Sequence, residues 1–290
     1  LFQQFQHPSL QKDLIALNTL KKVEKGGDVL RIELQLPFAW NTGVEQVKQQ
    51  LSDALLKATD SKEIKWIVNY QIATLKRANN QPAVKGVKNI IAVTSGKGGV
   101  GKSSVSVNLA LALQAQGARV GILDADIYGP SIPHMLGAPH QRPTSPDNQH
   151  ITPIKAYGLS ANSIGFLMDE DNATIWRGPM ASSALSQLLN ETLWDSLDYL
   201  VIDMPPGTGD IQLTLSQQIP VTGAVVVTTP QDIALLDAVK GVSMFERVSV
   251  PVLGIVENMS MHICSNCGHH EAIFGTGGAE KMAQKYNVKV

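Results

Sequence analysis

The sequence predicts an α/β fold in which a doubly wound, mostly parallel sheet is preceded by a small α+β domain. From Asn89 onward, apolar runs of strand length alternate with helical patterns. These runs are apolar on both faces, as parallel strands covered by helices must be. A glycine-rich loop joins the first of these strands to a helix. Before residue 77 the strand pattern instead alternates apolar and polar residues, as in a sheet with one face in water.

Length and composition fit a globular protein of one large domain, or of one medium domain and a small one. Of the 290 residues, 43% are hydrophobic and 17% charged, and 24 basic side chains face 25 acidic ones for a net charge of −1. With this balance the chain lacks the excess of basic residues that is typical of proteins that bind nucleic acid non-specifically. We see no signal peptide and no apolar run of membrane-spanning length. We therefore expect a cytoplasmic protein that binds neither nucleic acid nor membrane.

Residues 1–77 are the predicted small α+β domain, and the polar stretch at 78–88, which contains Pro and Gly, is a predicted linker. The predicted elements are a helix over 8–17, a strand over 28–37, a helix over 42–58 and a strand over 63–74. Alternation of apolar residues indicates the strands, and a helical period with Thr42 as N-cap indicates the second helix.

Residues 89–290 are the predicted sheet domain. Its predicted elements are strands over 89–95, 119–126, 197–205, 223–230 and 250–259, with a helix over 103–117 after the first strand. Ligands of such sheets bind at the carboxyl ends of the strands. The Pro-rich run at 137–150 predicts a mobile surface loop. The chain stops at "KYNVKV", a strand-like run, so we expect that the C-terminal end has been trimmed.

The run "GKGGVGKS" has the phosphate-loop pattern G-x-x-x-x-G-K-S between a strand and a helix. Glycines let successive backbone N–H groups wrap the phosphates, and the helix adds its positive end. Lys102 is expected to reach the β- and γ-phosphates, and the Ser103 hydroxyl to bind Mg²⁺. The predicted nucleotide-binding residues of this loop are Gly96, Lys97, Gly98, Gly99, Val100, Gly101, Lys102, Ser103 and Ser104.

Acidic residues follow two other predicted strands. Asp203 ends one apolar run, where a carboxylate can hold Mg²⁺ through water, and Asp124 and Asp126 end another. A single Asp at such a place is often a helix cap, but two strand ends with Asp beside a phosphate loop favour a metal and catalytic role. We prefer Asp126 as the group that orients the attacking water. The Pro-Pro-Gly-Thr-Gly run at 205–209 has the residues of a segment that moves with the γ-phosphate.

A second lysine, Lys97, lies among the loop glycines. A solvated surface lysine is one interpretation. The other is a cation that reaches the phosphates of a second, facing subunit, as an arginine finger supplied in trans does. The second interpretation makes the active species a homodimer with Lys97 as a catalytic residue.

Cys264 and Cys267 form a C-x₂-C pair just beyond the strand at 250–259. Two thiolates on one turn are half of a tetrahedral Cys₄ set, and a two-fold dimer would supply the other half for one shared cluster. Zinc bound with the aid of a nearby histidine, a redox dithiol and an inert pair are the alternatives. The histidines in question are His262, His269 and His270.

The loop "GKGGVGKS" resembles the deviant phosphate loop of MinD/ParA-like ATPases. Five further runs resemble the Mrp/ApbC family of iron–sulfur cluster carrier ATPases over about residues 88–280. They are "DADIYGPSIPHMLG", "WRGPMASSALSQLL", "LDYLVIDMPPGTGDIQLTL", "VTTPQDIALLDAVKG" and "VLGIVENMSMHICSNCG". Residues 1–77 are similar to the small iron–sulfur-assembly-type domain that often precedes this ATPase, although His7-Pro8 stands where relatives often have Asp-Pro.

The resemblance implies ATP, Mg²⁺ and a [4Fe–4S] cluster as cofactors. By motif, Lys97 is the lysine that acts across a dimer, and Asp126 is the switch I aspartate. Asp203 corresponds to the Walker B-like aspartate, and Asn258 in "VENMS" to the asparagine that reads adenine. With the resemblance, a cluster bridging two copies of Cys264 and Cys267 becomes the preferred interpretation of the cysteine pair.

The leading hypothesis is an ATP-hydrolysing carrier that binds a labile [4Fe–4S] cluster at a homodimer interface and hands it to apo-proteins. The alternatives are a ParA/MinD-like positioning ATPase with a structural zinc knuckle, and a reductase component that passes electrons through a bridging cluster. The "WRGP" run, with Arg177, is a mark of the resemblance to which we assign no physical role.

Overall fold

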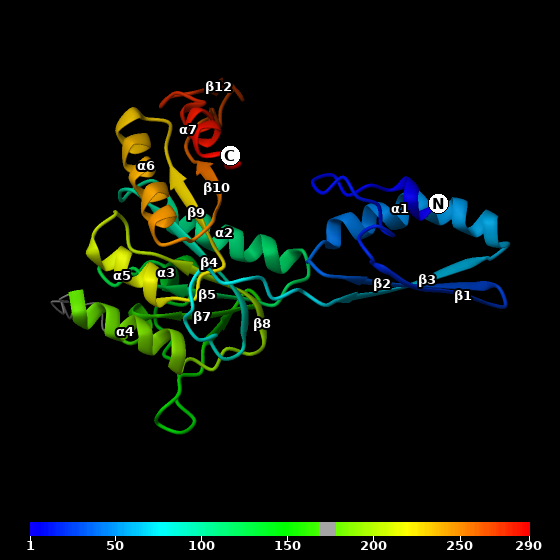
Figure 1. Cartoon of the computed structure of the whole chain (residues 1–290), viewed down its shortest axis with the longest axis horizontal. Helices are drawn as coiled ribbons and strands as arrows, with labels where there is room; N and C mark the ends of the chain where they lie inside the picture. The colour runs from blue at the N-terminus through cyan, green and yellow to red at the C-terminus, as the bar shows by residue number, and fades with distance from the viewer. Residues whose placement is uncertain (169–177) are drawn as a thin grey trace. The chain divides into compact units, whose positions relative to one another are not determined.

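The chain folds into two units, each built around its own sheet (Figure 1). The computed structural model describes residues 1–168 and 178–290. The first unit contains Leu1–Ala73 and Leu113–Ala118, and the second contains Thr74–Ala112 and Arg119–Val290. Within the described ranges, every helix is too short or too polar to cross a membrane.

In the first unit, one helix packs on a three-stranded sheet. Its elements are the 3₁₀ turn η1 (Phe2–Gln4), β1 (Leu20–Gly26), β2 (Val29–Leu36), α1 (Asn41–Thr59) and β3 (Glu63–Tyr70). The central strand β2 pairs antiparallel with β1 and parallel with β3. Every second residue of β2 and every third or fourth residue of α1 is buried, which is the pattern each element needs to face one core. These core residues are Leu30, Ile32, Leu34, Leu36, Val44, Val47, Leu51 and Leu55.

Two local predictions for this unit are wrong. Residues 8–17 form turns instead of a helix, because side chains bind the backbone N–H groups there. His7 Nδ1 and Asp13 Oδ1 each accept N–H bonds from the residues two and three positions further along. Helix α1 begins at Asn41, so Thr42 is not its N-cap. The Thr42 hydroxyl instead donates to Gln116 Oε1 at 2.9 Å.

The second unit is built on a seven-stranded sheet in the order β10-β9-β4-β8-β5-β7-β6. Only β6, at the edge, runs antiparallel to its neighbour. The strands are β4 (Val87–Ser95), β5 (Val120–Asp124), β6 (Ile154–Ala156), β7 (Leu159–Ser163), β8 (Leu197–Asp203), β9 (Gly223–Thr228) and β10 (Val252–Glu257). The fold class predicted from the sequence is therefore confirmed. The five predicted strands of this unit are confirmed within a few residues, whereas β6 and β7 were not predicted.

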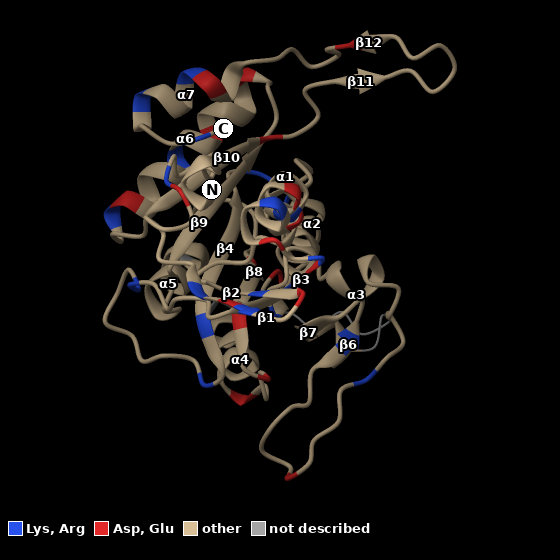
Figure 2. Cartoon of the chain, turned by 90° about the vertical axis from the view of Figure 1, so that its right-hand side faces the viewer, with Lys and Arg blue, Asp and Glu red and all other residues tan. Residues whose placement is uncertain are grey.

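Helices flank this sheet (Figure 1). They are α2 (Lys102–Ala115), α3 (Ile132–Met135), α4 (Gly178–Glu191), α5 (Asp210–Gln218), α6 (Asp232–Arg247) and α7 (Gly278–Tyr286), with the 3₁₀ turn η2 (Ile164–Phe166). Between β10 and α7 lies a small antiparallel hairpin of β11 (His262–Ile263) and β12 (His270–Glu271). Figure 2 shows this hairpin extending away from β10 and α7.

Two further stretches carry sequence predictions. The run at 137–150 forms neither helix nor regular strand and is mostly exposed, so it lies on the surface as predicted. The strand-like run at 285–290 instead begins inside α7, which ends at Tyr286. Beyond that helix, the Lys289 carbonyl accepts the N–H of Ile255, a residue of β10.

Candidate nucleotide and thiol sites

The predicted nucleotide residues gather at the carboxyl edge of the large sheet. The loop after β4, Asp203 at the end of β8 and Asp124 at the end of β5 lie side by side, because these three strands are parallel neighbours. On the other side of β4, β9 and β10 bring Asn258 to the same edge. The chain changes direction across the sheet at β4, which is where open α/β sheets bind ligands.

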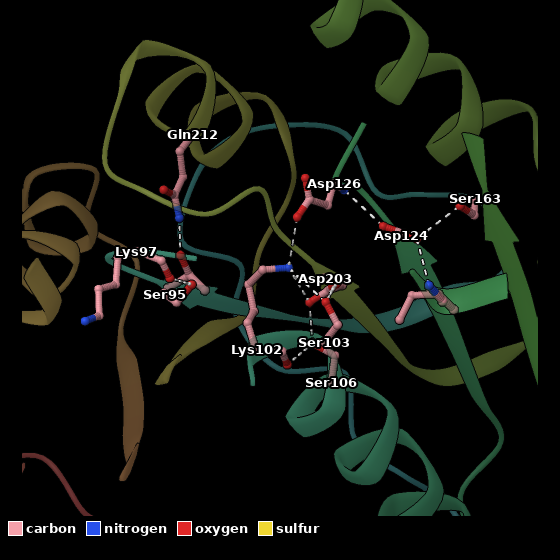
Figure 3. Close-up of polar contacts among 12 residues, drawn as sticks. Ser95, Lys97, Lys102, Ser103, Ser106, Asp124, Asp126, Ser163, Asp203 and Gln212 are labelled. Atoms are coloured by element: carbon pink, nitrogen blue, oxygen red, sulfur yellow. Dashed lines mark hydrogen bonds and ion pairs between the residues drawn. The ribbon is translucent and has the colours of Figure 1, made fainter. Parts of the chain in front are cut away.

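Asp203 is the fully buried centre of this cluster (Figure 3). Its carboxylate lies 2.8 Å from Lys102 Nζ and accepts hydrogen bonds from Ser103 Oγ at 2.6 Å and Ser106 Oγ at 2.7 Å. The ammonium and two hydroxyls compensate the cost of burying this charge. Lys102 and Ser103 are thereby held at the start of α2 next to a carboxylate, which suits them to phosphate and Mg²⁺.

Asp126 faces the same lysine from the loop after β5. Its Oδ2 atom lies 3.6 Å from Lys102 Nζ, and the side chain is 13% exposed. Burial raises the pKa of Asp126, and the Lys102 ammonium partly offsets that rise. Asp126 is thus a partly desolvated carboxylate that faces the cavity described below, a position from which a water molecule can be oriented.

Asp124 points into the protein and holds the loop that carries Asp126. It accepts the N–H groups of Asp126 and Ile132 and the Ser163 hydroxyl, each at 3.1 Å (Figure 3). Burial, followed by the charge of Asp203, raises the pKa of Asp124 to about 7. This residue therefore positions both ends of the loop at 125–131.

A cavity of about 210 Å³ is enclosed by the glycine loop, Asp126 and the Pro206 segment. Its lining residues are Ser95, Gly98, Gly99, Gly101, Lys102, Ser103, Ser104, Asp126, Ser131, Met135 and Pro206. A larger cavity of about 1270 Å³ lies between α4 and α5 and shares Asp126 and Pro206 with the first. We regard the smaller cavity as the phosphate site, because the glycine loop forms its wall.

Lys97 differs from Lys102 in its direction. In Figure 3 the Lys97 side chain points away from Lys102 and Asp203. Its carbonyl accepts the Ser95 hydroxyl at 2.8 Å, which holds the backbone of the loop while leaving the ammonium free to reach outward. Lys97 is not among the residues that line the smaller cavity.

Asn258 lies against the other side of the glycine loop. Its Nδ2 donates to the Val100 carbonyl at 2.9 Å. Gly101 has a left-handed φ of +86°, and a Cβ added there would lie 2.3 Å from Asn258 Nδ2. Only glycine therefore fits at position 101. One amide N–H of Asn258 binds the loop, and its second N–H and its Oδ1 remain available to a purine edge.

Residues 260–277, which lie between β10 and α7, form what we call the cysteine segment. Cys264 and Cys267 lie at the turn of the β11–β12 hairpin, where the Cys264 carbonyl accepts the Gly268 N–H and the Cys264 N–H binds the His269 carbonyl. Backbone N–H groups of Cys267 and Asn266 donate to the Cys264 sulfur and lower the pKa of its thiol. N–H groups directed at a sulfur favour the thiolate, which is the form that binds metals.

The histidines named in the zinc alternative do not complete a metal site in the described part of the chain. Across residues 1–168 and 178–290, no group of three or more His, Cys, Asp or Glu side chains is placed to hold a metal ion. Trp176 and Arg177 of the "WRGP" run lie outside the described residues.

Ser106 and Gln212 are among the polar residues of the site that were not predicted. Ser106, one helical turn after Lys102, donates to Asp203 and is fully buried. Gln212 of α5 donates through Nε2 to the buried Thr94 hydroxyl of β4. Both are polar residues at positions where the helix faces the sheet, and that misplaced polarity is the signal in the sequence that could have identified them.

Comparison with known proteins assigns this architecture to a family. Residues 86–290 match the family model of ParA, described as NUBPL iron-transfer P-loop NTPase. The chain is similar to the iron-sulfur cluster carrier protein of Haemophilus influenzae, with 92% identity over all of this chain and 78% of that protein. It is similar to the iron-sulfur cluster carrier protein of Escherichia coli K12, with 68% identity over 99% of this chain and 78% of that protein.

A solved structure supports the same fold. The nucleotide-binding protein of Archaeoglobus fulgidus, in complex with ADP, is 40% identical and has a TM-score of 0.62. The match covers 71% of this chain and 82% of that one.

Proposed function

The chain belongs to the ParA family of NUBPL-type iron-transfer P-loop NTPases, and on that premise we propose that it is an ATP-hydrolysing iron–sulfur cluster carrier. The cargo is a [4Fe–4S] cluster held between two copies of the chain and passed on to apo-proteins. The observation that carries the proposal is the pair of free thiols, Cys264 and Cys267, at the turn of the hairpin that follows β10, a strand of the nucleotide edge.

In the proposed nucleotide site, the glycine loop at 96–101 wraps the phosphates with its N–H groups. The Lys102 ammonium contacts the β- and γ-phosphates. Ser103 binds Mg²⁺, and Asp203 holds that ion through water. The 2.6 Å hydrogen bond from Ser103 to Asp203 supports this pairing, because it keeps the hydroxyl and the carboxylate that would hold the ion next to each other. Asp126 orients the attacking water.

Lys97 supplies the contact between the two subunits. Its side chain points away from its own cavity, so its proposed target is the phosphate of a facing copy. The nucleotide-loop edges of two copies then face each other across a two-fold axis. Each active site is complete only when the partner contributes its Lys97.

Across the same two-fold axis, two copies of the chain together supply four cysteines. Four thiolates are the usual ligand set of a [4Fe–4S] cluster. The chain alone supplies two, from the turn of the β11–β12 hairpin. Binding at an interface ties the affinity for the cluster to the state of the dimer, and so to the nucleotide that holds the dimer together.

Anaerobic reconstitution tests the cluster. The parent protein should take up about four iron and four sulfide per dimer, with the optical spectrum of a [4Fe–4S] cluster. Cys264→Ala should lose nearly all of this iron while remaining folded, because the hairpin has no part in the buried core. Ser265→Ala, in the same turn, is the matched control and should load like the parent.

Full iron loading of Cys264→Ala would show that the cluster is held elsewhere and would end this proposal. One tightly bound zinc ion per chain in the parent, with no iron uptake after reconstitution, would instead favour the zinc-knuckle alternative. Measuring iron, sulfide and zinc in the same samples separates the two cases.

A further inference from the structure

The last residue of β10, Glu257, carries an unusually well-bound carboxylate just before the cysteine segment. Its Oε1 accepts the Ser260 hydroxyl at 2.8 Å and the Gly277 N–H at 3.0 Å. Its Oε2 accepts the Ala279 N–H at 2.6 Å. Ser260 is the first residue of the cysteine segment and Gly277 the last. One side chain therefore binds both ends of the segment that holds the thiols.

The bonds are those of an ionised carboxylate. Partial burial alone would raise the pKa of Glu257, but the donors at Ala279, Ser260 and Gly277 outweigh it, and the pKa lies below its usual range. Gly277 and Ala279 belong to the start of α7, where unpaired N–H groups and the helix dipole favour a negative charge. The contact is thus both a clamp on the segment and the cap of the following helix.

The next residue joins this clamp to the glycine loop. Asn258 donates through Nδ2 to the Val100 carbonyl, and its own N–H binds the Thr228 carbonyl at 2.8 Å. Its amide fills the space beside Gly101, so the loop backbone and the Asn258 side chain cannot move independently. Met259 then has a left-handed φ of +62°, which fixes a tight turn between Asn258 and Ser260.

Glycine loop and cysteine segment are therefore separated by a single turn that is bonded on both sides. A displacement of the Val100 carbonyl is passed to Asn258, and the chain then reaches the Glu257 clamp without an intervening flexible residue. A short connection of hydrogen-bonded residues can pass a change of position from one site to another. It does so when the connecting residues, here 257–260, can adopt two distinct conformations.

We infer that Glu257 is a positioning residue that transmits occupancy of the phosphate loop to the cysteine segment. The inference rests on the proposed function for the role of the thiols, but the connection itself involves neither thiol. In this proposal, nucleotide binding orders residues 260–277, and that ordering depends on both carboxylate oxygens of Glu257.

Hydrogen exchange on the chain of residues 1–290, with no metal bound to its thiols, tests this connection. In the parent, Mg²⁺·ADP should slow exchange both in the glycine loop and in residues 260–277. In Glu257→Gln, the glycine loop should remain protected and the affinity for ADP should stay within about threefold. Protection of 260–277 should fall by at least half, because the amide of Gln offers one acceptor oxygen where the carboxylate offers two.

Glu280→Gln is the matched control. It removes the same charge from the first turn of α7, at an exposed position, and should leave exchange in 260–277 as in the parent. Ser260→Ala removes one bond of the clamp with little risk to folding and should give a partial loss of protection. If Glu257→Gln unfolds, the exchange of residues 260–277 in Ser260→Ala tests the inference in its place.

Cobalt(II) bound to the thiols gives a second readout. Mg²⁺·ADP should change the Co²⁺ affinity of the parent by several-fold and leave that of Glu257→Gln unchanged. Two outcomes overturn the inference: a parent whose segment does not respond to ADP, and a Glu257→Gln variant that responds as strongly as the parent. Because the exchange samples contain Mg²⁺ but neither a cluster nor cobalt, their result stands apart from whether Cys264→Ala loads a cluster.

Discussion

Two aspartates on adjacent strand ends of this protein have opposite surroundings. Asp203 is paired with the Lys102 ammonium at 2.8 Å, whereas Asp124 is bound by backbone N–H groups and a hydroxyl. The sequence could predict that Asp203, Lys102 and Ser103 would meet, because the phosphate-loop pattern and the strand ends define that edge. It could not predict the partners of Ser106 and Ser163, since a serine inside a helix or a strand gives no sign of which carboxylate it will reach.

The Asp124 carboxyl should make the stability of the protein depend on pH. Burial raises its pKa to about 7 in the folded chain, against about 4 when unfolded. A raised pKa stabilises the fold below the unfolded value, and this contribution is lost as the pH rises through about 7. The free energy of unfolding, measured by urea titration without nucleotide, should therefore fall more steeply between pH 5 and 8 in the parent than in Asp124→Asn. Parallel curves for the two proteins would contradict the raised pKa.

At the scale of elements, continuous apolar runs made the central strands predictable. β4, β8 and β9 are mostly buried, and each contains an unbroken run of three or four aliphatic residues. β7, in contrast, is fully buried although it reads Leu-Ser-Ala-Asn-Ser, because its polar groups find partners such as Thr192 for Asn162. A strand whose polarity is satisfied by tertiary contacts has no periodic signal of its own. The helix expected over 8–17 does not form, because the side chains of His7 and Asp13 accept backbone N–H groups that a helix would use.

The packing of α6 on the glycine loop is a contact between elements that can be tested. A Cβ at Gly96 would lie 2.3 Å from the carbonyl carbon of Asp237 in α6, so Gly96→Ala must push this helix away from β4. Overpacking of this kind costs about 1–3 kcal/mol. Gly98→Ala, in the same loop, meets no atom within 4 Å and should leave the free energy of unfolding nearly unchanged. Equal stabilities of the two variants, measured without nucleotide, would show that α6 does not rest on the loop.

At the scale of the whole molecule, the second lysine makes a prediction about assembly. Lys97→Ala should bind ATP normally but lose about 10³-fold or more in kcat, the range for a cation supplied in trans. Lys102→Ala should be inactive because it cannot hold its own phosphates. In an equal mixture, half of the dimers pair one of each and regain one complete site. Activity should return to about a quarter of the parent rate.

The mixing result separates a lysine that acts across an interface from one that acts within its own chain. If the mixture hydrolyses ATP no faster than its two components measured apart, Lys97 does not act on a partner. Sequence could suggest this arrangement only from the extra lysine and the resemblance of the loop, because a facing subunit leaves no periodic pattern in a single chain.

The β11–β12 hairpin has a consequence for how tightly cargo can be held. Its two strands pair over only two residue pairs, His262 with Glu271 and Ile263 with His270. So short a ladder is marginally stable by itself in water. If the proposed cluster binds at its turn, metal–thiolate bonds would supply much of the free energy that keeps the hairpin folded, and ligand binding and local folding would become one equilibrium. Release of the cluster would then let the hairpin unfold. The entropy gained by that unfolding would offset part of the bond energy and so favour delivery over storage.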